Sequence, residues 1–69
     1  MKISARNVFK GKVAEVKPGN VNTEVIIYIP GGLQVVSMIS KDSAANLGLK
    51  KGRTAYAVIK ASSVMVAVD

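Results

Sequence analysis

The chain has 69 residues, of which 49% are hydrophobic, and it carries a formal net charge of +6 at pH 7. It contains no Cys and no His, which excludes disulfides and the usual zinc, copper and iron–sulfur sites. One domain of this size lies near the lower limit for a single hydrophobic core, so the high apolar content predicts surfaces buried between the subunits of a homo-oligomer.

The hydrophobic runs are far shorter than the roughly 20 residues that a membrane-spanning helix needs. The N-terminus lacks the continuous apolar segment of a secretory signal, so we expect a cytoplasmic protein without a membrane partner. The positive charge favours an anionic partner, which could be nucleic acid, an acidic membrane surface or a small oxyanion.

Three strands are predicted in the first half of the chain. β-Branched and charged residues mix over residues 5–17, and the turn signal 18–20 follows. Residues 21–29 then alternate between two faces, the turn signal 30–32 ends this strand, and a third strand follows over 33–39. The positions that share one face of the second strand are Val21, Thr23, Val25, Ile27 and Ile29.

Residues 40–48 predict a helix of about two turns. Ser40 can cap its N-terminus, and Asp42 stands in the first turn, where the helix dipole favours a carboxylate. Gly48 suits the left-handed position that follows the last turn. The helix is short and needs a sheet to pack against.

Two more strands are predicted after a turn at 50–52, one over 53–60 and one over 63–68, with a bend at Ala61-Ser62. Five strands with a short helix between the third and the fourth is the order of an OB-fold. We therefore predict an all-β protein, a five-stranded Greek-key barrel formed by one domain over residues 1–69.

Two short motifs at opposite ends of the chain combine a cation with hydroxyl or small residues. They are Ser4-Ala5-Arg6-Asn7 and Lys60-Ala61-Ser62. A desolvated oxyanion needs this combination of positive charge, hydrogen-bond donors and room for close backbone approach.

Read together, these motifs resemble those of the Mop family of molybdate-binding proteins, the molbindins, and the resemblance covers essentially the whole chain. The matching segments are Ser4-Ala5-Arg6-Asn7, Ile39-Ser40 followed by Ser43, Asn46-Leu47-Gly48-Leu49, Lys51-Gly52 and Lys60-Ala61-Ser62.

The resemblance implies a molybdate site at a subunit interface, with Ser4 and Arg6 from one chain and Lys60 from another. It also implies a hexamer that binds molybdate or tungstate reversibly, and storage or homeostasis is the expected role because the sequence offers no second domain. The residues expected at the site are Ser4, Ala5, Arg6, Ser40, Lys60, Ala61 and Ser62. A second anion site on a symmetry axis would use Gly19, Val21, Asn22 and Thr23, although a plain type I′ or bulged hairpin turn is the preferred explanation of that segment.

Molybdate is a tetrahedral dianion that carries no protons at neutral pH, so a selective site should present only donors. Neither motif contains or adjoins an acidic residue, and two cations balance two negative charges. With no His or Cys, the metal must be bound as the complete oxyanion, without direct ligation by the protein and without a separate cofactor. Discrimination against sulfate would then depend on cavity size.

Simpler explanations of the same residues stay open. Ser40 serves equally well as a helix cap alone, Arg6 has Glu15 and Asp69 as candidate ion-pair partners, and Lys60 stands where a surface charge is common.

Other functions are less well supported. Catalysis lacks a paired set of carboxylates, and Ser–Lys chemistry at Lys60 is the only enzymatic arrangement the sequence offers. Nucleic acid is the main alternative partner for an OB-fold, but Phe9, Tyr28 and Tyr56 occupy positions that an alternating strand could bury, which argues against it. A purely structural assembly module is the third alternative.

Overall fold

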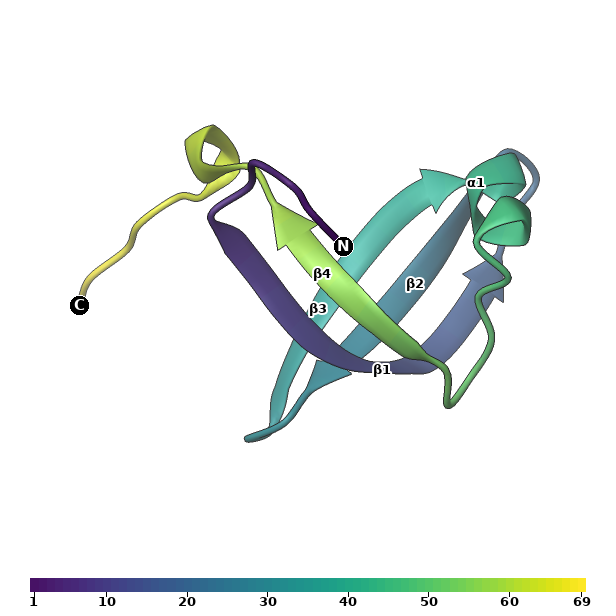
Figure 1. Ribbon diagram of the computed structural model, residues 1–69, viewed down its shortest axis with the longest axis horizontal. Helices are drawn as coiled ribbons and strands as arrows, with labels where there is room; N and C mark the ends of the chain where they lie inside the picture. The colour runs from purple at the N-terminus through teal and green to yellow at the C-terminus, as the bar shows by residue number, and fades with distance from the viewer.

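The computed structural model describes residues 1–69, and its strands form one antiparallel sheet that curls around a small core (Figure 1). The strand order is β3-β2-β1-β4, so the fourth strand returns to lie beside the first. The predicted all-β chain with one short helix between the third and fourth strands is confirmed. The elements are β1 (Asn7–Pro18), β2 (Asn22–Ile29), β3 (Leu33–Ser40), α1 (Lys41–Asn46), β4 (Thr54–Ile59) and the 3-10 turn η1 (Ala61–Ser63).

The core lies on the concave face of the curled sheet. Its buried members Val13, Val25, Ile27 and Ala57 come from β1, β2 and β4. Thr23 is buried on the same face of β2 as Val25 and Ile27, as the alternation predicts. The sheet thus places every second residue of its strands inside, and the intervening residues cover the convex face.

The long strand β1 bends so that it can pair with two different strands. Its first half pairs with β4 and its second half with β2, and the register shifts between Val13 and Glu15. A bulge of this kind adds twist and bends a strand. Gly11 is needed at the bend, because a Cβ there would clash with the carbonyl oxygen of Tyr28. This bend gives the sheet its half-barrel shape.

The helix begins and ends as predicted. The Ser40 Oγ accepts a hydrogen bond from the Ser43 N–H at 3.1 Å, and Asp42 lies in the first turn. Gly48 follows the last turn with φ of 62°, the left-handed conformation that glycine adopts without strain. The guanidinium of Arg53 donates to the Gly48 carbonyl at 3.0 Å and ties this end of α1 to the start of β4.

The predicted fifth strand over 63–68 is wrong for the single chain. Residues 64–69 have no strand partner, and in Figure 1 they lead away from the sheet as an extended arm. The exposed fraction of Met65, Val66 and Val68 is 93%, 89% and 91%. These residues have strand propensity, but a strand also needs a neighbour for its backbone hydrogen bonds, and none is within reach. The sheet therefore has four strands, and the five-stranded barrel is not closed.

The aromatic side chains are also more exposed than the alternation predicts. The exposed fraction is 37% for Phe9, 43% for Tyr28 and 45% for Tyr56. Tyr28 and Tyr56 each directly follow or precede a buried residue, Ile27 and Ala57, so they face outward. With a single layer of sheet, nothing in the chain covers them.

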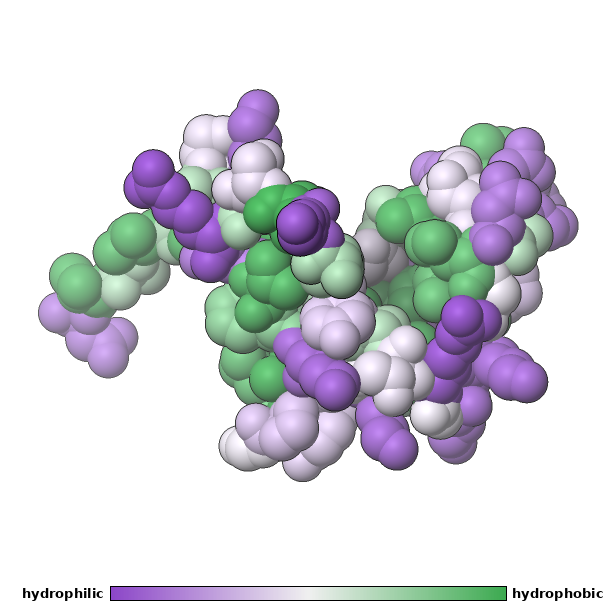
Figure 2. Space-filling view, in the orientation of Figure 1, coloured by the Kyte–Doolittle hydropathy of each residue, from purple (hydrophilic) through white to green (hydrophobic).

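An apolar groove of about 650 Å³ runs along the concave side, between the edge strands β3 and β4 and the segment after α1. Hydrophobic side chains gather on both sides of a hollow in Figure 2. The chain exposes 5520 Å² in total, whereas a monomeric globular protein of 7.2 kDa exposes about 4,100 Å². None of the helices has the length and hydropathy that a membrane span requires.

Candidate oxyanion-binding site

The pairing of β1 with β4 brings the two cationic motifs together. The last pair of the ladder is Asn7 opposite Ile59, so Arg6 and Lys60 stand opposite each other one position beyond it. The side-chain Nδ2 of Asn7 donates to the Ile59 carbonyl at 3.2 Å and fixes this end of the ladder. Residues 54 positions apart in sequence thus become neighbours through strand register alone.

Both motifs line one open cavity of about 660 Å³. The sequence motifs were expected to come from two subunits, whereas the structure brings them together within a single chain. Ile3 and Val58 add apolar walls that the prediction from the motifs missed. Val58 lies two residues before Lys60 in β4 and is paired with Val8 of β1. The lining residues are Ile3, Ser4, Ala5, Arg6, Val58, Lys60, Ala61 and Ser62.

The two cations of the cavity are free of partners within the chain. Neither Arg6 nor Lys60 forms a side-chain hydrogen bond or an ion pair, and no acidic residue lines the cavity. The alternative in which Arg6 pairs with Glu15 or Asp69 is therefore not what the structure shows. Two uncompensated positive charges face the same opening.

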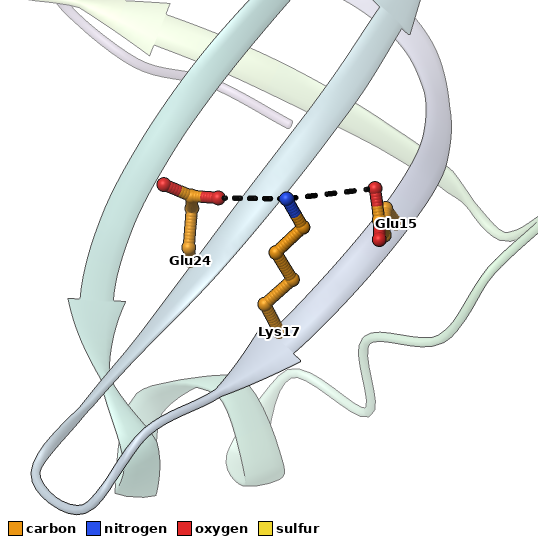
Figure 3. A network of polar contacts seen from close by, with 3 residues as sticks. All are labelled: Glu15, Lys17 and Glu24. Carbon is orange, nitrogen blue, oxygen red and sulfur yellow. Dashed lines mark ion pairs between the residues drawn. The ribbon is translucent and has the colours of Figure 1, made fainter.

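Glu15 is instead engaged elsewhere. Figure 3 shows the Lys17 Nζ between two carboxylates, 3.9 Å from Glu15 and 3.6 Å from Glu24. This network joins β1 to β2 near the other end of β1, and it keeps these two acidic groups away from the cavity.

Backbone donors complete the lining at η1. The Ser63 N–H donates to the Lys60 carbonyl at 2.8 Å and the Val64 N–H to the Ala61 carbonyl at 3.3 Å, and these two bonds close the turn. The N–H groups of Ala61 and Ser62 precede the bonded ones and are not used by the turn. The cavity can therefore offer guanidinium, ammonium, hydroxyl and amide donors to one bound group.

Comparisons with known proteins identify the family of the chain. The sequence model of the TOBE domain matches residues 3–66. Molybdenum-pterin-binding protein 3 of Clostridium pasteurianum is 53% identical over 66 residues, which cover 96% of this chain and 97% of that protein. The chain belongs to the Mop family of TOBE-domain proteins. The family resemblance of the sequence is thereby confirmed.

Two solved structures have the same fold. MopII from Clostridium pasteurianum superposes with a TM-score of 0.93 at 46% identity and covers 97% of this chain and 100% of its own. The cytoplasmic molybdate-binding protein ModG, in a form with molybdate bound, gives a TM-score of 0.90 at 46% identity. The match covers 94% of this chain and 46% of ModG.

Ser40 lies apart from the other residues expected at the site. It ends β3 opposite Asn22, at the end of the sheet remote from the cavity, and Figure 1 shows α1 and η1 on opposite sides of the molecule. Besides capping α1, its Oγ donates to the Ser43 Oγ at 2.8 Å. Within one Mop chain Ser40 is a helix cap, and only a second copy could bring it to the cavity.

The second predicted anion site falls on the β1–β2 turn. The Gly19 N–H donates to the Asn22 carbonyl at 2.8 Å, which closes the turn, and Thr23 is only 2% exposed. Val21 is exposed beside them. In the single chain the Gly19 amide and the Thr23 hydroxyl are thus not presented to solvent, and this site stays a prediction.

Proposed function

We propose that the chain binds molybdate in the cavity between the β1 and β4 ends. The proposal rests on one observation. Arg6 and Lys60 have no ion-pair partner, and they line one cavity that also holds hydroxyl and amide donors and no carboxylate. Two positive charges match the charge of the dianion, and charge-assisted hydrogen bonds to its oxygens are the strong kind. The molybdate-bound form of ModG, which shares the fold, supports molybdate as the ligand.

Tungstate should bind at the same place, because it has the same charge and tetrahedral shape. Sulfate has the same charge and shape but is smaller. The donors of the site could therefore reach its oxygens only through longer, weaker hydrogen bonds. The proposed role is binding without catalysis, since the cavity has no carboxylate, His or Cys to act as a general base.

A homo-oligomer, which we propose to be a hexamer, would complete the site. The cavity is open, and its ligand residues except Ala5 are exposed, so a single chain would leave a bound anion in water. The uncovered groove, the hydrophobic arm 64–69 and the open edges of β3 and β4 give the chain extensive surface to bury against copies of itself. Ser40 of a neighbouring copy is the residue we propose to add the last hydroxyl.

The cytoplasm is the proposed compartment, in keeping with the description of ModG as cytoplasmic. Reversible binding by a small oligomer with several cavities would serve to store or buffer the oxyanion.

Native mass spectrometry with a thermal scan tests this proposal. Molybdate and tungstate should add whole numbers of anions to a hexamer and raise its melting temperature. At a free anion concentration of about 100 times Kd, the stabilisation is roughly 2.7 kcal/mol. An equal shift with equimolar sulfate, or molybdate binding by a monomer with undiminished affinity, would contradict it.

A further inference from the structure

The convex face carries a group of aromatic and basic side chains that the oxyanion site does not use. Lys10 of β1 stands opposite Tyr56 of β4, and Lys12 of β1 stands opposite Tyr28 of β2. Directly opposite residues of an antiparallel pair share a face with their Cβ atoms about 5 Å apart. The four residues thus form one diagonal across three strands, which we call the Tyr–Lys surface.

The side chains of this surface are exposed in the single chain, and Tyr56 also lines the edge of the apolar groove. Tyr28 and Tyr56 are 43% and 45% exposed, and Lys10 and Lys12 are both exposed. None of the four forms a side-chain hydrogen bond or an ion pair. None of them lines the oxyanion cavity.

The spacing of these four residues suits an extended partner that carries negative charges along its backbone and flat rings beside it. Lys10 and Lys12 are two residues apart on one strand, which corresponds to about 6.8 Å. The two tyrosines lie on the strands flanking β1, about 9.6 Å apart across the sheet. Such a surface presents two cations between two aromatic rings, and a flat hydrophobic partner without negative charge would leave the cations unused.

We propose that the Tyr–Lys surface binds single-stranded nucleic acid, with bases stacked on Tyr28 and Tyr56 and phosphates beside Lys10 and Lys12. Base stacking on exposed aromatic rings and a basic track for the backbone are the two elements of this type of binding. The net charge of +6 supplies the long-range attraction. Farther along the same face, Glu15 and Glu24 share a single cation, Lys17 (Figure 3). The remaining negative charge repels phosphate and favours binding at the Lys10 end.

The chain provides its own reporter for the test. It has two Tyr and no Trp, so the fluorescence excited in the Tyr absorption band comes from Tyr28 and Tyr56. Titration of the full-length assembled protein with a fluorescein-labelled 15-nucleotide oligothymidylate should quench this fluorescence and raise the anisotropy of the label. A duplex of mixed sequence should bind more weakly, because its bases are not free to stack.

Variants separate stacking from general charge. Tyr28→Ala and Tyr56→Ala should each weaken oligothymidylate binding about tenfold, and Tyr→Phe at the same positions should retain it, because the ring is kept. Lys10→Gln with Lys12→Gln should weaken binding and lower the slope of log K against log salt by about 1.4. The matched control, Lys50→Gln with Lys51→Gln, removes the same charge from the turn before β4 and should leave affinity within about threefold.

Several results would overturn the proposal: no binding of the oligothymidylate at 150 mM salt, equal losses in the two double-lysine variants, or tighter binding of the duplex. Binding to phosphatidylserine vesicles that depends on the same four residues and exceeds oligothymidylate binding would also overturn it. The molybdate-induced rise in melting temperature should persist in Tyr28→Ala, so failure at this surface and failure of the oxyanion site are distinguishable.

Discussion

The two ends of the curled sheet carry similar residues in opposite states. At the α1 end, Ser40 is bonded to Ser43 and Arg53 to the Gly48 carbonyl. At the η1 end, Arg6 and Lys60 have no partner in the chain. A polar group that is hydrogen-bonded within its own fold contributes to stability. Donors that lie together without an acceptor in the chain can instead bind an acceptor from outside, such as an anion. The difference distinguishes the structural set of serines and Arg53 from a binding set of serines, Arg6 and Lys60.

The largest expected effect comes from separating the subunits, because only a second copy can bring the two ends together. Val66→Asp places a carboxylate in the exposed hydrophobic arm, and burying it against a neighbour without a partner is strongly unfavourable. We expect a monomer with most of its molybdate-induced stabilisation lost, measured by native mass spectrometry and thermal scans. Val66→Leu, which keeps the side chain apolar, should assemble and bind normally. A fully assembled Val66→Asp protein would show that the arm lies outside the interface.

The contrast between the two arginines gives the next effect in size. Arg6→Ala and Lys60→Ala should each abolish the molybdate-induced rise in melting temperature, because a dianion would face one cation in place of two. Arg53→Ala removes the same charge at the other end. It should keep the molybdate response and lower the stability of the free protein by about 1 kcal/mol, since it loses the bond to Gly48. Binding that survives in Arg6→Ala but fails in Arg53→Ala would reverse the assignment of the two ends.

Substitution of Ser40 tests whether the structural end also serves the binding end of a neighbour. Ser40→Asp keeps a side chain that caps helices well, so the free protein should keep its melting temperature. In the assembly it would bring a carboxylate to the anion, and molybdate affinity should fall at least about tenfold. Ser40→Ala loses the cap, which costs about 1 kcal/mol. Unchanged molybdate affinity in Ser40→Asp would leave Ser40 as a cap only.

Local patterns predicted most of the fold. The alternation in residues 21–29 identified the buried face of β2, and the cap at Ser40 and the glycine at 48 identified both ends of α1. The predicted strand over residues 63–68 was wrong because strand propensity describes a single segment. Strand pairing also requires a second segment to hydrogen-bond with, and a propensity pattern does not show whether one is present. The exposure of Tyr28 and Tyr56 follows from the same cause, since alternation tells which residues share a face and not whether that face is covered.

The sequence assigned both motifs at the chain ends to one candidate site. Both motifs at the chain ends do line one cavity. The β1–β4 register already places Arg6 opposite Lys60 in one chain, and the division of the site between two subunits stays a prediction. β1 pairs with both β2 and β4 because it bends at Gly11 and carries a bulge after Val13, and neither feature has a clear signal in a single sequence.

The smallest expected effect concerns Asn7, which holds the binding end in register without lining the cavity. Its bond to the Ile59 carbonyl fastens β4 one residue before Lys60. Asn7→Ala should therefore lower the free energy of unfolding by about 1 kcal/mol. Because Lys60 would then move more freely relative to Arg6, molybdate affinity should fall a few fold while the number of bound anions stays the same.

Asn7→Asp is the sharper control: it keeps the size of the side chain but cannot donate to the carbonyl, and it adds a negative charge next to Arg6. Its loss of affinity should exceed that of Asn7→Ala, and isothermal titration of the two variants should show this order. The reverse order would mean that Asn7 affects the anion by some route other than the alignment of the two strand ends.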